Sequence, residues 1–190
     1  LLLFVTALAA CGGSGSPTPA GVTTAASTPG AGDSAVGDAA SLLASGQSKL
    51  SAGSLDAAAA DFQASLSKGK SLDGYFGLGN AYTRQGKLVE AETAYNEALK
   101  INPNHVATLS NLGVVYYQQA KLADAKRIFE RALAANPGDA ETHYLLGATQ
   151  LQLNELDEAE KSLKRALDLK PQLPEARFGI ARLRQMQGPT

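Results

Sequence analysis

The feature that constrains this chain most is a proline that returns every 34 residues, at Pro103, Pro137 and Pro171. The neighbouring residues return with it, so three units align without a gap: residues 72–105, 106–139 and 140–173. Each unit begins with an apolar stretch, passes a turn and continues as an alanine-bearing segment that stops before the proline. Each unit is therefore predicted to be a pair of antiparallel helices, and the fold to be all-α.

Small residues recur at fixed places in these units and predict close helix packing. Gly79, Gly113 and Gly147 fall in the middle of the first helix of each pair. A glycine there costs about 1 kcal/mol relative to alanine, so a neighbouring helix is expected to approach closely. A large residue recurs between two alanines of the second helix and is expected to fill the space between helices. These large residues are Tyr95, Phe129 and Leu163.

The pattern resembles the tetratricopeptide repeat, which combines Leu-Gly, Tyr, a turn Gly, Ala, an aromatic residue, Ala and Pro over 34 residues. One unit supplies nearly all of it, with Leu78, Gly79, Tyr82, Gly86, Ala91, Tyr95, Ala98 and Pro103. Residues 39–71 fit the template as a degenerate first unit, and residues 174–187 fit a lone first helix. The resemblance implies a right-handed superhelical solenoid of antiparallel helix pairs. Arg177 and Arg184 stand where Tyr75 and Tyr82 stand earlier, so the last helix is expected to be a solvated cap that ends the array.

The N-terminal residues resemble the signal of a bacterial lipoprotein. The opening LLLFVTALAA is about half as long as a membrane-spanning helix and ends in small residues, as a secretory signal does. The following Leu8-Ala9-Ala10-Cys11 resembles a lipobox, which implies cleavage before Cys11 and its acylation. Residues 1–10 are thus predicted to be a signal peptide whose start is missing, because the sequence opens at Leu1 without Met or basic residues. The alternative is an incidental or buried cysteine.

Residues 11–38 are predicted to be the lipidated cysteine and a disordered tether. This stretch is rich in Gly, Pro, Ser and Thr, and all 17 Lys and Arg residues of the chain come after it. The resemblance to lipoproteins implies a lipid-anchored protein of the bacterial cell envelope. It would lie on the outer membrane facing the periplasm if the organism has one, and otherwise on the outer face of the cytoplasmic membrane.

The residues contain no pattern typical of an enzyme, a cofactor site or a metal site. No glycine loop precedes a lysine and no nucleophile is matched with a base, so we expect no catalytic residues and no cofactor. Lys68 to Ser71 read KGKS but lack the upstream glycine of a phosphate loop. His143 has no partner ligand, so no metal is expected, and a net charge of −1 argues against a nucleic-acid partner.

The resemblance implies that the first helices line a concave groove that binds an extended peptide or a helix. Two asparagines, Asn80 and Asn111, match positions of the carboxylate clamp of some family members. The clamp's basic positions hold Phe76, Glu141 and Leu145, so that ligand is not expected. Both asparagines lie outside the packing signature, and their loss is expected to leave folding nearly intact. The predicted groove residues are Phe76, Asn80, Arg84, Asn111, Tyr117, Tyr144, Leu151, Phe178 and Arg182.

Two functions remain open for this surface. The first is a membrane-tethered adaptor that holds a peptide or helix of an envelope protein in the groove, with the lipid at Cys11 as anchor. The second is an accessory subunit that activates an envelope enzyme or captures a glycan. The groove aromatics also fit a simpler interpretation in which they pack only between neighbouring repeats.

Overall fold

The computed structural model describes residues 31–188, which form nine α-helices and no strand. Eight of them form four pairs of a first and a second helix, and the ninth corresponds to a first helix without a second one in this range. The first helices are α1 (Ala31–Ser51), α3 (Leu72–Arg84), α5 (Val106–Gln118), α7 (Ala140–Gln152) and α9 (Pro174–Gln187). The second helices are α2 (Leu55–Lys68), α4 (Leu88–Ile101), α6 (Leu122–Ala135) and α8 (Leu156–Leu169).

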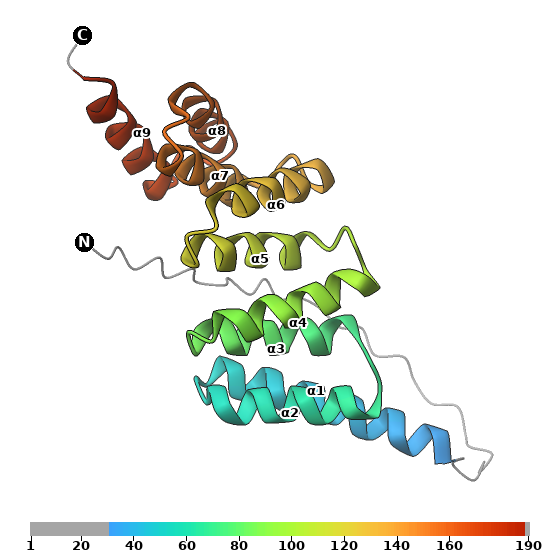
Figure 1. Cartoon of the computed structure of the whole chain (residues 1–190). Coiled ribbons are helices and arrows are strands. Elements are labelled where there is room, and N and C mark those ends of the chain that lie inside the picture. Colours follow the sequence, from blue (N-terminus) through green and yellow to red (C-terminus); the bar gives the residue numbers. More distant parts are fainter. Residues whose placement is uncertain (1–30, 189–190) are drawn as a thin grey trace.

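The helices are stacked in chain order, from α1 and α2 at one end to α9 at the other (Figure 1). Each helix contacts the next, and the contact is most extensive within the predicted pairs. The all-α solenoid predicted from the 34-residue period is therefore confirmed. The start of the first unit differs from the prediction, because α1 begins at Ala31 and not at Ala39. Residues 31–38 are helical although the tether was predicted to reach residue 38, while Cys11 and the rest of the signal and tether lie outside the described residues.

Prolines and left-handed residues set the ends of the helices. The residues before Pro103, Pro137 and Pro171 are the C-caps of α4, α6 and α8, as predicted, because a residue before proline disfavours the helical region. The turn inside each pair needs a residue with positive φ. The first two turns use Gly53 (φ 81) and Gly86 (φ 75), and the later two use Ala120 (φ 58) and Asn154 (φ 60).

The core is built from a large side chain of each second helix packed on a glycine of its own first helix. A Cβ added to Gly113 would lie 2.4 Å from Cε1 of Phe129, and one added to Gly79 would lie 2.4 Å from Cε1 of Tyr95. Atoms at that separation overlap, so these helices pack only because the glycines have no side chain. The close approach predicted for the mid-helix glycines is confirmed.

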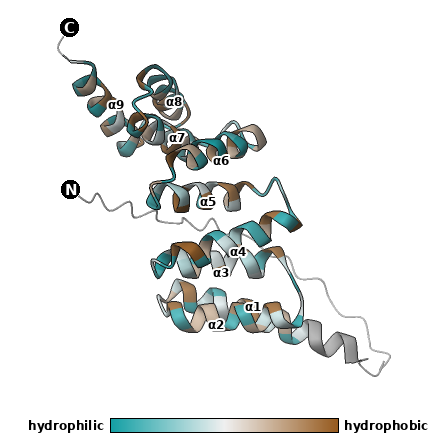
Figure 2. Cartoon of the chain, viewed as in Figure 1, coloured by the Kyte–Doolittle hydropathy of each residue, from teal (hydrophilic) through white to brown (hydrophobic). Residues whose placement is uncertain are grey.

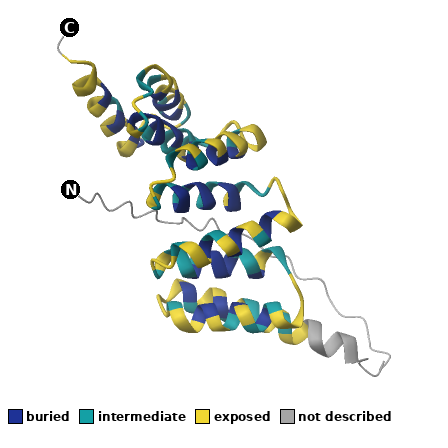
Figure 3. Ribbon diagram, in the orientation of Figure 1, coloured by how far each residue is buried: buried dark blue, intermediate teal, exposed yellow. Residues whose placement is uncertain are grey.

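At both ends of the stack, a second glycine reaches the same large side chain from the next repeat. The ring of Phe62 lies against Gly46 of its own unit and Gly77 of the following one. Leu163 lies in the same way against Gly147 and Gly179. Buried residues follow the helix sides that meet neighbouring helices (Figure 3), and hydrophobic and hydrophilic residues alternate around each helix (Figure 2). The buried apolar residues form four clusters along the stack, and residues of neighbouring repeats contribute to the same cluster.

Candidate partner-binding face

The first helices form the inner layer of the stack. Each of α1, α3, α5 and α7 contacts the next first helix along the chain, whereas within residues 31–188 no second helix contacts another second helix. Elements on the inner side of a curved stack lie closer together than those outside, so the first helices line the concave side. We call the exposed and half-exposed residues of α3, α5, α7 and α9 on this side the first-helix face.

Asn80 and Asn111 meet on the first-helix face at the junction of two repeats. Nδ2 of Asn111 donates to Oδ1 of Asn80 at 2.7 Å, and the hydroxyl of Tyr95 donates to the same oxygen at 2.7 Å. Tyr95 is fully buried, and this burial raises the pKa of its phenol to about 12. Asn80 accepts from a buried hydroxyl that Thr83 also reaches at 3.2 Å, so its loss is now expected to cost stability, in contrast to the expectation from the sequence.

The same two amides keep hydrogen-bonding atoms for a ligand. No hydrogen bond found within residues 31–188 uses Nδ2 of Asn80 or Oδ1 of Asn111. Both side chains are half-buried, so these atoms are not sealed in the core. One donor group and one acceptor are therefore fixed on neighbouring repeats, which is the pairing that a peptide unit of a ligand requires.

An aromatic row crosses the face at one position of the repeat. It contains Phe76, Tyr144 and Phe178, and the equivalent residue of the repeat between Phe76 and Tyr144 is Ser110. The Phe76 ring packs edge-on against His105, with ring centroids 5.4 Å apart, and Tyr144 packs on the cluster that contains Leu173. His105 and Leu173 are the N-caps of the following first helices, so the first two aromatics are half-covered by the next repeat. Phe178 has no such cover and is 58% exposed.

The remaining predicted residues divide between structural and accessible roles. Arg84 is exposed and donates to the backbone carbonyl of Leu50, near the end of α1. The half-buried Tyr117 accepts a hydrogen bond of 2.6 Å from Nε2 of Gln152, and Arg182 is exposed. Gln152 is an exposed face residue that the sequence analysis missed, although it lies 34 residues after Gln118 and 68 after Arg84.

The assignment of Leu151 to the groove needs correction. Its side chain is only 3% exposed and lies in a core cluster with Ala159, Leu163 and Leu183. An aliphatic side chain at this position gains free energy by burial against α8 and α9, whereas its equivalents Thr83 and Tyr117 carry polar atoms. Leu151 is therefore a core residue, and a partner cannot contact it without opening the stack.

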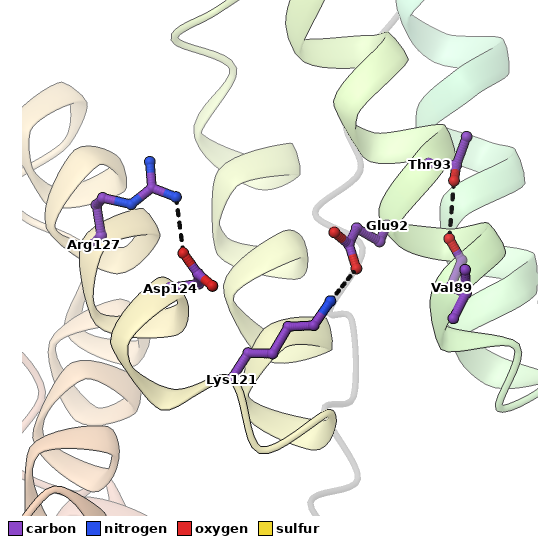
Figure 4. A network of polar contacts seen from close by, with 6 residues as sticks. All are labelled: Val89, Glu92, Thr93, Lys121, Asp124 and Arg127. Carbon is purple, nitrogen blue, oxygen red and sulfur yellow. Dashed lines mark hydrogen bonds and ion pairs between the residues drawn. The ribbon is translucent and has the colours of Figure 1, made fainter.

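Ion pairs link successive repeats near the start of the second helices, and Figure 4 shows the one between Lys121 and Glu92. Lys121 donates to Glu92 of the preceding repeat at 2.9 Å, and one repeat later the charges are exchanged, with Lys126 donating to Glu155 at 2.6 Å. Burial alone would raise the pKa of Glu92, but hydrogen bonds led by that from Lys121 bring it below its ordinary value. The hydrogen bond that Lys126 donates to Glu155 raises the pKa of the Lys126 ammonium. These pairs lie at the junctions between successive helix pairs.

Within residues 31–188, no group of three or more His, Cys, Asp or Glu side chains is placed to hold a metal ion. None of the helices in the same range has both the length and the apolar character needed to cross a membrane.

Comparison with known proteins identifies the repeat. Two family models, described as TPR repeat and tetratricopeptide repeat, match residues 79–119 and 110–174. This chain contains tetratricopeptide repeats. No curated protein matches it.

Solved structures of tetratricopeptide repeat proteins share the fold. MamA from Desulfovibrio magneticus is 23% identical with a TM-score of 0.75, covering 79% of this chain and 85% of its own. A tetratricopeptide repeat protein from Parabacteroides merdae is 26% identical with a TM-score of 0.74, covering 80% and 61%. The first TPR domain of Spaghetti (RPAP3), bound to the HSP90 peptide SRMEEVD, is 28% identical with a TM-score of 0.59, covering 60% and 91%. The tetratricopeptide fold supports a protein-interaction scaffold.

Proposed function

We propose that this chain is an adaptor that binds an extended peptide or a helix of an envelope protein along its first-helix face, while a lipid on Cys11 holds it at a membrane. The observation that carries the binding role is the Asn80–Asn111 pair, whose remaining amide atoms are fixed on adjacent repeats and half-exposed. The similar TPR domain of Spaghetti was solved with a peptide bound. The basic residues of a carboxylate clamp are replaced here by Phe76, Glu141 and Leu145, so the proposed ligand differs from one held by its terminal carboxylate alone.

The binding role is tested with a variant that removes the face amides without leaving a buried hydroxyl alone. Tyr95→Phe removes the hydroxyl that Asn80 accepts from, so Asn80→Ala and Asn111→Ala can be added in that background. We expect the added pair to weaken binding of peptides selected from a phage-displayed random library by about 1–3 kcal/mol through lost hydrogen bonds. The single variant Tyr95→Phe is the control for folding. Unchanged affinity of the triple variant would reject the face as the peptide site.

The membrane role is tested separately in the full-length precursor. Cys11→Ser removes the proposed acylation site, so the protein is expected in the soluble fraction or as an unprocessed precursor. The wild-type chain, labelled with radioactive palmitate in bacterial cells, is the positive control. Equal membrane retention and equal processing of the two proteins would reject the lipid anchor.

A further inference from the structure

We propose that the α9 end of the first-helix face recognises a protein segment in which an acidic residue lies two positions from an apolar one. The apolar side chain covers Phe178 and the carboxylate pairs with Arg182. This inference rests on the proposed peptide-binding function and adds the chemistry of the ligand.

Phe178 offers an uncovered apolar contact at the end of a row. The equivalent Phe76 and Tyr144 are partly covered by His105 and by the cluster that contains Leu173, each from the next first helix. Phe178 is 58% exposed, and α9 as a whole is the most exposed end of the stack in Figure 3. An apolar side chain of a ligand would cover Phe178 as His105 covers Phe76, and burying aromatic area in this way stabilises a complex.

The charges of the face change along the stack and favour an acidic residue at α9. Helix α5 has no charged residue, and Glu141 is the only acidic or basic residue of α7 apart from His143. Helix α9 carries three arginines and one glutamate. Arg177, Arg182 and Arg184 are exposed, and none of the salt bridges found within residues 31–188 uses them. Unpaired guanidinium groups bind carboxylates strongly because they donate two parallel hydrogen bonds.

The spacing of the two side chains defines the ligand. Phe178 and Arg182 are four residues apart on one helix, so their Cβ atoms lie about 6 Å apart on the same side. In an extended chain, alternate residues point to one side and are separated by about 6.6 Å. An apolar residue at one position and Asp or Glu two positions later therefore match Phe178 and Arg182 together.

A protein segment fits this end better than a membrane surface does. Phe178 continues the aromatic row that crosses the repeats on the concave side. A flat bilayer reaches the edges of a curved stack more readily than its concave side. Arg177 and Arg184 stand where Tyr75 and Tyr82 stand in an earlier repeat, and their positive charge strengthens the attraction for an acidic chain.

The experiment selects peptides from a phage-displayed random library against the full-length chain with Cys11→Ser, so that the anchor does not contribute. We expect enrichment of peptides with an apolar residue and an Asp or Glu two positions apart, in either order. Arg182→Glu should remove the preference for the acid and weaken the best synthetic peptide about ten-fold, since a charge pair is lost and a repulsion gained. Phe178→Ser should weaken the same peptide by a similar factor. The matched control is Arg165→Glu, which makes the same charge change at an exposed position of α8.

The synthetic peptide is made with a free and with an amidated C-terminus, and equal affinities assign the contact to the acidic side chain. Enriched peptides that lack an acid and bind Arg182→Glu as well as wild type would overturn this inference and leave the proposed function standing. If no peptide is enriched, the proposed function fails, and this inference fails with it. Binding to phosphatidylglycerol vesicles that depends on Arg182, without acidic peptides being selected, would overturn the inference in favour of a membrane surface.

Discussion

The packing of Gly113 against Phe129 gives the sharpest test of the stack. A Cβ at Gly113 would lie 2.4, 2.7 and 2.8 Å from three ring atoms of Phe129, and the ring is fully buried. Gly113→Ala therefore forces the ring or the helices to move, which costs about 1–3 kcal/mol. This cost is partly offset because alanine favours the helix over glycine by about 1 kcal/mol. The net expectation is a loss of about 1 kcal/mol for alanine and of about 2–4 kcal/mol for Gly113→Leu.

The measurement is urea unfolding followed by far-ultraviolet circular dichroism, with the denaturant slope compared between variants to confirm that the same structure unfolds. Gly37→Ala is the matched control, because Gly37 is also helical but has no atom within 4 Å of an added Cβ. That variant should keep the wild-type stability or raise it by up to about 1 kcal/mol.

The clash can also be assigned to its partner. In a Phe129→Val background the ring atoms nearest to the new Cβ are absent, so adding Gly113→Ala should no longer destabilise the protein. The free energies of the two changes should then differ from additivity by about 1 kcal/mol or more. If Gly113→Ala raises the unfolding free energy in the wild-type background as Gly37→Ala does, the close-packed helix pair is refuted.

Three further predictions concern the turns, the buried tyrosine and the repeat junctions. Ala120→Gly should raise the unfolding free energy by about 0.5–1 kcal/mol in urea titrations, because Ala120 has a positive φ of 58°. The control Ala123→Gly, in the first turn of α6, should lower the unfolding free energy. A loss of stability in both variants would contradict the strained turn. The phenol of Tyr95 has its pKa raised to about 12, so the native state keeps a proton that the unfolded state releases above about pH 10. Wild type should therefore be fully stabilised below that pH and lose roughly 2–3 kcal/mol relative to Tyr95→Phe as the pH rises to about 12; parallel stability curves would argue against burial of the phenol. Lys126→Glu should destabilise the stack slightly and Glu155→Lys should restore it, with a coupling of about 0.2–1 kcal/mol by double-mutant cycle; zero coupling would mean that the pair contributes nothing.

The sequence predicts the parts of this fold that packing repeats every 34 residues. The helices of this pair meet because Gly113 leaves room for Phe129, so a glycine and a large residue recur at these two positions every 34 residues. Pro103 and its equivalents end the second helices for a steric reason that is local to the chain. The left-handed turn residue is recognisable at Gly86 but not at Ala120, because the strain of an alanine there is small enough for the packing to override.

The candidate site is harder to predict from the sequence because its residues form hydrogen bonds and packing contacts with other repeats and other helices. Asn80 carries no packing signature, and its role appears only when the Tyr95 hydroxyl and the Asn111 amide are seen to converge on it. Helical periodicity assigns Leu151 to the concave side, but the free energy of burial against Leu183 decides where the side chain lies. Residues 31–38 of α1 were assigned to the tether because their glycine-containing composition is also typical of a tether.

The division between repeated and variable positions explains how the two ends of one scaffold present different side chains. The mid-helix glycines and the large side chains that pack on them are repeated, because a change there costs stability in whichever unit it occurs. The position of Asn80 instead becomes Val114, Ala148 and Arg182 in successive first helices. Val114 and Ala148 are half-buried and uncharged, whereas Arg182 is exposed. The α3 end of this row therefore presents an amide and the α9 end a guanidinium, so an acidic residue of a ligand is favoured at α9.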